Sequence, residues 1–141
     1  EVPFDNEELM KALLNQLTLD KVVEGFVHPV IHRSEALKAV GGYDTRFLPG
    51  KQGYEDDSLL IGYRYYLGTK SNWKPKCLLK TRVFHATLAQ RMSLADKNDD
   101  FRKNLRGLIY QYGVKGLLEL NYIYEDNNHF KEIAAQLLKE I

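Results

Sequence analysis

Three consecutive acidic residues, Glu55, Asp56 and Asp57, form the feature of this sequence with the clearest chemical potential. Residues 55–67 carry apolar side chains at helical spacing, which predicts that the acids occupy the first turn of a helix. The positive end of a helix stabilises negative charge, whereas repulsion between neighbouring carboxylates favours protonation of at least one of them. A carboxylate in such surroundings can accept a proton from a hydroxyl group bound in a cleft.

A glycine-rich segment precedes these acids. Gly41 and Gly42 follow a short predicted helix, and residues 43–54 contain two further glycines and a proline, which predicts a loop. Glycines would let the backbone approach a bulky polar substrate closely. A plainer interpretation is also open, because first-turn acids and a Gly-Gly pair are ordinary helix caps. Residue types alone do not decide between the two.

Two motifs at a fixed gap add information. The first is Arg33-Ser34-x-x-Leu37-x-x-Val40-Gly41-Gly42-Tyr43-Asp44-x-x-Phe47, and the second is Glu55-Asp56-x-x-Leu59, with Arg64 shortly after. Together they resemble the second half of the inverting glycosyltransferases of the GT-A fold. They are similar both to the large family-two group and to the C-terminal region of the β-1,4-galactosyltransferases. The resemblance covers residues 26–93, about half of the chain.

The resemblance implies a role for each matching residue. Asp56 matches the catalytic base that takes the proton of the attacking acceptor hydroxyl. His85 matches a histidine that in several such enzymes ligates a divalent metal, Mn or Mg, and Arg91 is a weaker match for a contact to the donor phosphates. The residues expected around the acceptor are Glu55, Asp57, Gly41, Gly42, Tyr43, Asp44 and Tyr54.

The implied reaction is a single in-line displacement, in which the acceptor oxygen attacks the anomeric carbon opposite the nucleoside diphosphate. The GT-A fold also needs a nucleotide-binding half with an Asp-x-Asp motif. Neither that tripeptide nor a glycine-rich phosphate loop occurs in this sequence. We therefore expect an N-terminal nucleotide-binding half in a parent protein, and metal binding only together with that half. The expected partners are a nucleotide-sugar donor and a glycan acceptor.

Composition sets wider limits. With 44% hydrophobic and 28% charged residues, the 141-residue chain is of globular type and fits one domain. The net charge of +1, with both signs mixed along the chain, gives no reason to expect a nucleic-acid partner. The single cysteine excludes an internal disulfide and favours a reducing, cytoplasmic location, with the inner membrane surface as a variant of it. No apolar run is long enough to span a bilayer.

The first residues show neither a signal-peptide pattern nor an initiator methionine, so we expect the chain to be a piece of something longer. Its pattern predicts an α/β fold, α+β for the isolated fragment: the acceptor-side half of a GT-A fold, with few strands and a helical tail. Residues 1–95 form the acceptor-binding and catalytic-base portion, and residues 96–141 form a helical extension packed on it, as one domain overall. Helices are predicted over residues 6–19, 35–40, 55–67, 99–112, 114–124 and 128–141, and strands over residues 22–32 and 73–84.

Three functions remain as hypotheses. The first is an inverting transferase that adds a hexose or N-acetylhexosamine to a glycan or lipid-linked acceptor, with this fragment inactive alone. The second is a non-catalytic carbohydrate-binding or interaction module that keeps the acceptor cleft. The third is a structural helical domain whose motif match is accidental.

Overall fold

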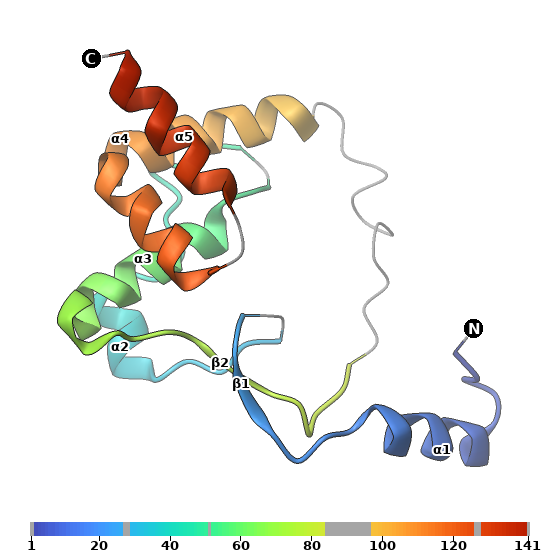
Figure 1. Ribbon diagram of the computed structural model, residues 1–141. Helices are drawn as coiled ribbons and strands as arrows, with labels where there is room; N and C mark the ends of the chain where they lie inside the picture. Colours follow the sequence, from blue (N-terminus) through green and yellow to red (C-terminus); the bar gives the residue numbers. More distant parts are fainter. Residues whose placement is uncertain (1, 27–28, 51, 84–96, 126–127, 141) are drawn as a thin grey trace.

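The computed structural model describes residues 2–26, 29–50, 52–83, 97–125 and 128–140. Within these ranges the protein is a small, mostly helical α+β domain with five α-helices and one two-stranded sheet (Figure 1). Its elements are α1 (Glu7–Leu17), β1 (Val22–Glu24), α2 (Ser34–Ala39), α3 (Glu55–Leu67), the 3-10 helix η1 (Thr69–Ser71), β2 (Lys76–Leu78), α4 (Lys97–Ile123) and α5 (Asn128–Lys139).

The core lies between α3, α4 and α5. The apolar run at the centre of α3 supplies Leu60 and Ile61, α4 supplies Leu117 and Leu120, and α5 supplies Phe130; all five side chains are buried. Burying a side chain of this size contributes about 1.5–3 kcal/mol. α4 packs against both α3 and α5, so it is the central element of the helical part (Figure 1).

α4 bends at Gly113, where the backbone has φ 62° and ψ −164°. The sequence predicts a helix end at this glycine, and the break is confirmed, although the chain resumes the helix at once and ends it at Ile123. Glycine adopts a positive φ without a steric penalty because it has no Cβ. The half of α4 before the bend contacts the loop that precedes α3, through Asn104 and Gln111.

The sheet is much shorter than predicted. β1 pairs with β2 in antiparallel register, with Val23 opposite Cys77. The predicted strands over residues 22–32 and 73–84 are therefore wrong in length, although their places are right. The N–H of Gly25 still donates to the carbonyl of Pro75 over 3.0 Å, but Pro75 has no N–H to donate in return, so the ladder ends there. Phe84, at the predicted end of the second strand, lies outside the described residues.

The helix ends follow local signals with one exception. The Asn6 side chain caps α1 by accepting a hydrogen bond from the N–H of Leu9 over 3.0 Å. In α2, Ser34 is the first helical residue, and Arg33 occupies the cap position without a side-chain hydrogen bond. α3 begins and ends where the sequence predicts. No side chain of α1, which lies wholly within the described ranges, is buried, and Leu9, Leu14 and Leu17 are exposed.

The arginine of the second motif holds two helices together. Arg64 is buried; its Nε donates to Glu119 on α4 over 2.6 Å, and its guanidinium lies 4.3 Å from the centre of the Tyr122 ring. Its role here is to join α3 to α4.

No helix in the described ranges is long and apolar enough to cross a membrane.

Candidate functional site

The two glycines after α2 turn the chain toward the loop. Gly41 and Gly42 have φ of 83° and 70°, a region that other residues rarely adopt. The N–H of Gly42 donates to the carbonyl of Leu37 over 3.0 Å, which ends the helix as a Schellman-type cap. The cap interpretation of the Gly-Gly pair is therefore correct, and it remains compatible with a nearby site.

Asp44 anchors the loop. Its carboxylate accepts hydrogen bonds from the backbone N–H groups of Arg46 and Phe47, over 2.8 and 3.3 Å, and from Nε2 of Gln111 over 3.0 Å. Burial raises the pKa of Asp44, but the hydrogen bonds from Arg46, Phe47 and Gln111 outweigh it and lower the pKa overall. This geometry supports a structural role for Asp44, since both of its oxygens are already engaged within the loop and with α4.

A buried asparagine of α4 fixes the backbone just before α3. Oδ1 of Asn104 accepts from the N–H of Gly50 over 2.7 Å, and Nδ2 lies 3.1 Å from the carbonyl of Gln52 and 2.8 Å from that of Gly53. Asn104 is 1% exposed. These bonds hold three loop residues in the conformation that leads into the acidic helix start.

Tyr54, the last residue before α3, has a left-handed backbone with φ 65°. This conformation is unfavourable for a residue with a Cβ and persists where the surroundings impose it, often at functional sites. The ring of Tyr54 packs edge-on against Phe101 of α4 and Phe130 of α5, and its hydroxyl lies 3.2 Å from Nε2 of His129. Both C-terminal helices therefore hold this residue in place.

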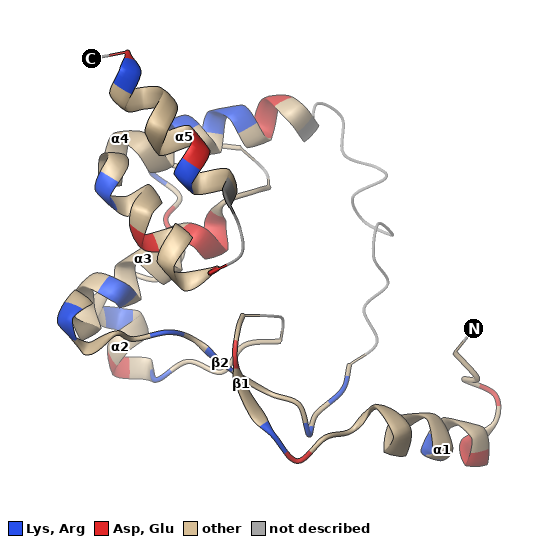
Figure 2. Ribbon diagram, in the orientation of Figure 1, with Lys and Arg blue, Asp and Glu red and all other residues tan. Residues whose placement is uncertain are grey.

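The acidic first turn of α3 faces a small open hollow of about 210 Å³. This turn is drawn red at the start of α3 in Figure 2. The residues around the hollow come from the segment after β1, from the loop, from α3 and from the C-terminal helical part, and they are Phe26, Gln52, Gly53, Tyr54, Glu55, Asp56, Asp57, Phe101 and Tyr124. The hollow is smaller than the roughly 300–1,000 Å³ of pockets for drug-sized ligands.

The three acids have different surroundings. Asp57 is partly buried and accepts a hydrogen bond from the hydroxyl of Tyr124 over 2.9 Å. Burial raises its pKa to about 6; the charges of Asp56 and Glu55 act in the same direction, and the Tyr124 hydrogen bond opposes them. The pKa of Tyr124 is raised in turn, by burial and by the charge of Asp57.

Asp56 lies beside the hydroxyl of Tyr43. Burial, the charge of Asp56 and a hydrogen bond to its carboxylate together raise the pKa of the Tyr43 phenol. Two residues that the sequence places in the site, 13 positions apart, are thus in contact. The contact also shows that the Asp56 carboxylate can be reached by a hydroxyl group.

Two side chains at the hollow carry buried polar atoms that have no hydrogen-bond partner among the described residues. Among the described residues, Oε2 of Glu55 and both amide atoms of Gln52 are buried without a hydrogen bond. Gln52 as a whole is 8% exposed. Buried polar groups are hydrogen-bonded in the great majority of cases, so unpartnered ones beside a hollow indicate a place where a ligand could bind.

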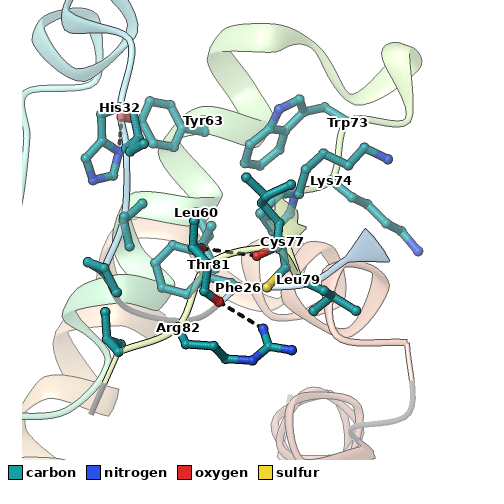
Figure 3. Close-up of a pocket in the computed structure, with 17 residues that line it drawn as sticks. Phe26, His32, Leu60, Tyr63, Trp73, Lys74, Cys77, Leu79, Thr81 and Arg82 are labelled. Atoms are coloured by element: carbon teal, nitrogen blue, oxygen red, sulfur yellow. Dashed lines mark hydrogen bonds between the residues drawn. The ribbon is translucent and has the colours of Figure 1, made fainter. Parts of the chain in front are cut away.

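A second and larger cavity, of about 580 Å³, lies beside β2 and shares Phe26 with the hollow (Figure 3). Apolar side chains dominate it, including Leu60, Trp73 and Leu79, and none of the described residues that line it is acidic. At its edge the hydroxyl of Tyr63 lies 2.9 Å from Nδ1 of His32. None of the acceptor-site residues predicted from the sequence lines this cavity, and we assign it no role.

The structure brings five of the predicted residues together: Glu55, Asp56, Asp57 and Tyr54 at the hollow, and Tyr43 beside Asp56. Asp44 instead faces its own loop and Gln111, and the Gly-Gly pair caps α2. His85 and Arg91 lie outside the described residues. In the described part, no group of three or more His, Cys, Asp or Glu side chains is arranged to hold a metal ion.

Sequence reasoning missed several lining residues, namely Phe26, Gln52, Phe101 and Tyr124. Gln52 belongs to the predicted loop, and only its burial distinguishes it from a surface glutamine. Phe101 and Tyr124 come from helices that the sequence marks as a packing layer, with no local signal linking them to α3.

Comparison of the chain with protein-family models, with curated proteins and with solved structures finds no match.

Proposed function

We propose that this chain forms the acceptor-side part of an inverting glycosyltransferase, which transfers a hexose or N-acetylhexosamine from a nucleotide-sugar to a glycan or lipid-linked acceptor. Asp56 is the base that takes the proton of the acceptor hydroxyl. The observation that carries this proposal is the position of Asp56, which lines an open hollow and already contacts the hydroxyl of Tyr43. A sugar hydroxyl entering the hollow can reach the same carboxylate in a similar way.

The neighbouring acids support a division of roles. Asp57 is held by Tyr124 and has a pKa of about 6, so near neutral pH it is partly protonated and repels the adjacent acids less. Glu55 has a buried carboxylate oxygen with no hydrogen bond among the described residues, which is available to an acceptor hydroxyl. If the acids served only to compensate the helix dipole, no hollow with unpartnered polar atoms beside them would be required.

In the proposed reaction, the proton of the acceptor O–H group moves to the carboxylate of Asp56. The oxygen forms a bond to the anomeric carbon of the donor, while the bond from that carbon to the nucleoside diphosphate breaks on the opposite face, so the configuration inverts. A divalent metal bound with the nucleotide-binding half would stabilise charge on the departing diphosphate. The residues described here would bind and orient the acceptor and accept its proton.

The test uses Asp56→Asn in the parent protein that contains the proposed nucleotide-binding half. Asparagine keeps the shape of the side chain but cannot take up the proton, so we expect kcat to fall by about 10²–10⁴-fold while acceptor affinity changes little. Transfer is measured as nucleoside diphosphate released from UDP-glucose, UDP-galactose and UDP-N-acetylglucosamine when acceptor is added.

The matched control is Asp99→Asn. Asp99 is also an acid in the first turn of a helix, but it is exposed and its carboxylate pairs with Lys103 over 2.6 Å. We expect this variant to keep full activity. Unchanged transfer in Asp56→Asn would remove this residue as the base, and retained sugar binding with no transfer in the wild type would favour the carbohydrate-binding module.

A further inference from the structure

Gln52 is a buried polar side chain, and the described part of the fold supplies no hydrogen bond that would explain its burial. It is 8% exposed, and neither its amide oxygen nor its amide nitrogen has a hydrogen-bond partner among the described residues. Leaving a buried donor and acceptor unpaired lowers stability, whereas an apolar side chain of similar size would not. A feature that lowers stability and persists beside a hollow points to a function there.

The backbone of Gln52 is firmly held. Its carbonyl accepts a hydrogen bond from Nδ2 of Asn104 over 3.1 Å, and the carbonyls of Gly50 and Gly53 contact the same amide group. The side chain is therefore carried by a fixed piece of chain at the wall of the hollow. Turning its terminal amide toward the hollow would break no hydrogen bond among the described residues.

The chemistry of the wall restricts the ligand. A primary amide both donates and accepts, while the carboxylates of Glu55 and Asp56 only accept when ionised. A ligand with several hydroxyl groups satisfies all three side chains, since each hydroxyl both donates and accepts. A simple cation such as an ammonium or guanidinium group could pair with the acids, but it offers no acceptor to the N–H groups of Gln52. An anionic ligand is repelled by the three acids.

We propose that Gln52 selects the acceptor by binding two neighbouring hydroxyl groups of a neutral sugar ring seated in the hollow, donating to one and accepting from the other. The aromatic walls formed by Phe26 and Phe101 suit the C–H face of such a ring. This assignment rests on the proposed function, because it takes the hollow as the acceptor site. It excludes uronic acids and phosphorylated sugars at the position next to Asp56.

The test is a titration of the ¹⁵N-labelled 141-residue chain followed by NMR. The probes are the methyl β-glycosides of glucose, galactose and N-acetylglucosamine, together with methyl β-glucuronide. The glucuronide differs from the glucoside only by a carboxylate at C6. We expect at least one neutral glycoside to shift the side-chain NH₂ signals of Gln52, and the glucuronide to bind at least about 10-fold more weakly than the glucoside.

Gln52→Met separates binding from folding. Methionine has a similar length and volume but cannot donate, so we expect sugar affinity to fall by about 10-fold. The midpoint of urea unfolding should stay the same or rise, because two unpartnered buried polar atoms are removed. The same variant identifies the Gln52 NH₂ signals by their loss. Gln136→Met, at an exposed glutamine of α5, is the matched control and should change neither quantity.

Three results would overturn the assignment: no neutral glycoside shifts the Gln52 signals, the glucuronide binds as tightly as the glucoside, or Gln52→Met binds the sugar as well as the wild type does. The outcomes also separate this inference from the proposed function. Loss of transfer in Asp56→Asn without any role of Gln52 leaves the function standing and removes the selection. Sugar binding through Gln52 with unchanged transfer in Asp56→Asn keeps the binding site and removes the catalytic base.

Discussion

The hydroxyl of Tyr124 donates a hydrogen bond to Oδ1 of Asp57 over 2.9 Å and so joins the end of the long helix α4 to the first turn of α3. The bond stabilises the carboxylate, yet burial outweighs it and raises the pKa of Asp57 to about 6. One of the three acids at the hollow therefore titrates close to neutral pH. Its protonation state is linked to the stability of the fold.

The first prediction concerns Asp57→Asn and pH. The folded-state pKa of about 6 exceeds the ordinary value of 3.8, so the folded protein keeps this proton at pH values where the unfolded chain has lost it. The contribution of Asp57 to stability therefore falls as pH rises from about 4 to about 6, by up to ~3 kcal/mol. Asparagine stays neutral and can still accept from Tyr124, so Asp57→Asn should be more stable than the wild type above pH 6 by about 1–3 kcal/mol.

Urea unfolding of both proteins between pH 4 and pH 8 measures this difference. Asp5→Asn, at an exposed acid near the start of the chain, controls for the loss of one negative charge and should follow the wild type. Tyr124→Phe removes the donor, so it should raise the pKa of Asp57 further and lower stability at pH 7 by about 1–2 kcal/mol. A pH profile of Asp57→Asn parallel to that of the wild type would contradict the assigned pKa.

The acidic helix start could be predicted because its signals are local. Apolar spacing after residue 55 and the glycine at position 53 mark where α3 begins, and Gly68 marks where it ends. The strands were overestimated because β-branched and aromatic residues favour extended chain, while the pairing itself depends on partners. Pro75 limits that pairing, and a pattern of residue types alone does not show where two strands stop pairing.

The rest of the site depends on contacts across the fold. Asn104 is 51–54 positions away from the loop residues that it binds, and Tyr124 is 67 positions away from Asp57. In the sequence, an asparagine and a tyrosine within long helical patterns look like surface or packing residues. Gln52 could not be identified either, because a glutamine in a loop is usually exposed and only the packing of α4 on that loop buries it.

The second prediction concerns Asn104, whose amide holds the loop to α4. Asn104→Ala leaves the N–H of Gly50 and the carbonyls of Gln52 and Gly53 without this partner in a buried place. We expect a loss of about 2–4 kcal/mol in the free energy of unfolding. Asn104→Asp should be no better, because a carboxylate can accept from Gly50 but has nothing to donate to the two carbonyls.

Chemical denaturation checks the stability of both variants. Asn98→Ala, at an exposed asparagine near the start of the same helix, is the control and should lie within about 0.5 kcal/mol of the wild type. Because the loop carries Gln52, the two Asn104 variants should also lose sugar binding in the hollow, whereas Asn98→Ala should retain it. Wild-type stability in Asn104→Ala would mean that the loop holds its shape without α4.

The third prediction compares two helical glycines that meet different neighbours. A Cβ added at Gly107 of α4 would lie 1.6 Å from the carbonyl oxygen of Phe47, whereas one added at Gly62 of α3 would lie 3.2 Å from Cβ of Val40. Alanine in place of glycine ordinarily stabilises a helix by about 1 kcal/mol. In Gly62→Ala this gain should roughly offset a slight displacement of Val40, so the stability should change by less than about 1 kcal/mol.

In Gly107→Ala the clash cannot be relieved by a small side-chain movement, because the added Cβ meets the backbone carbonyl of Phe47. α4 and the loop must move apart, and the hydrogen bonds of Asn104 to that loop stretch with them, so we expect a loss of about 3 kcal/mol or more. Urea unfolding of the two alanine variants side by side measures the contrast. Since the same displacement would carry Gln52 away from the hollow, Gly107→Ala should bind the neutral glycosides less tightly than Gly62→Ala. Equal stability of the two variants would show that α4 is not seated against the backbone of Phe47.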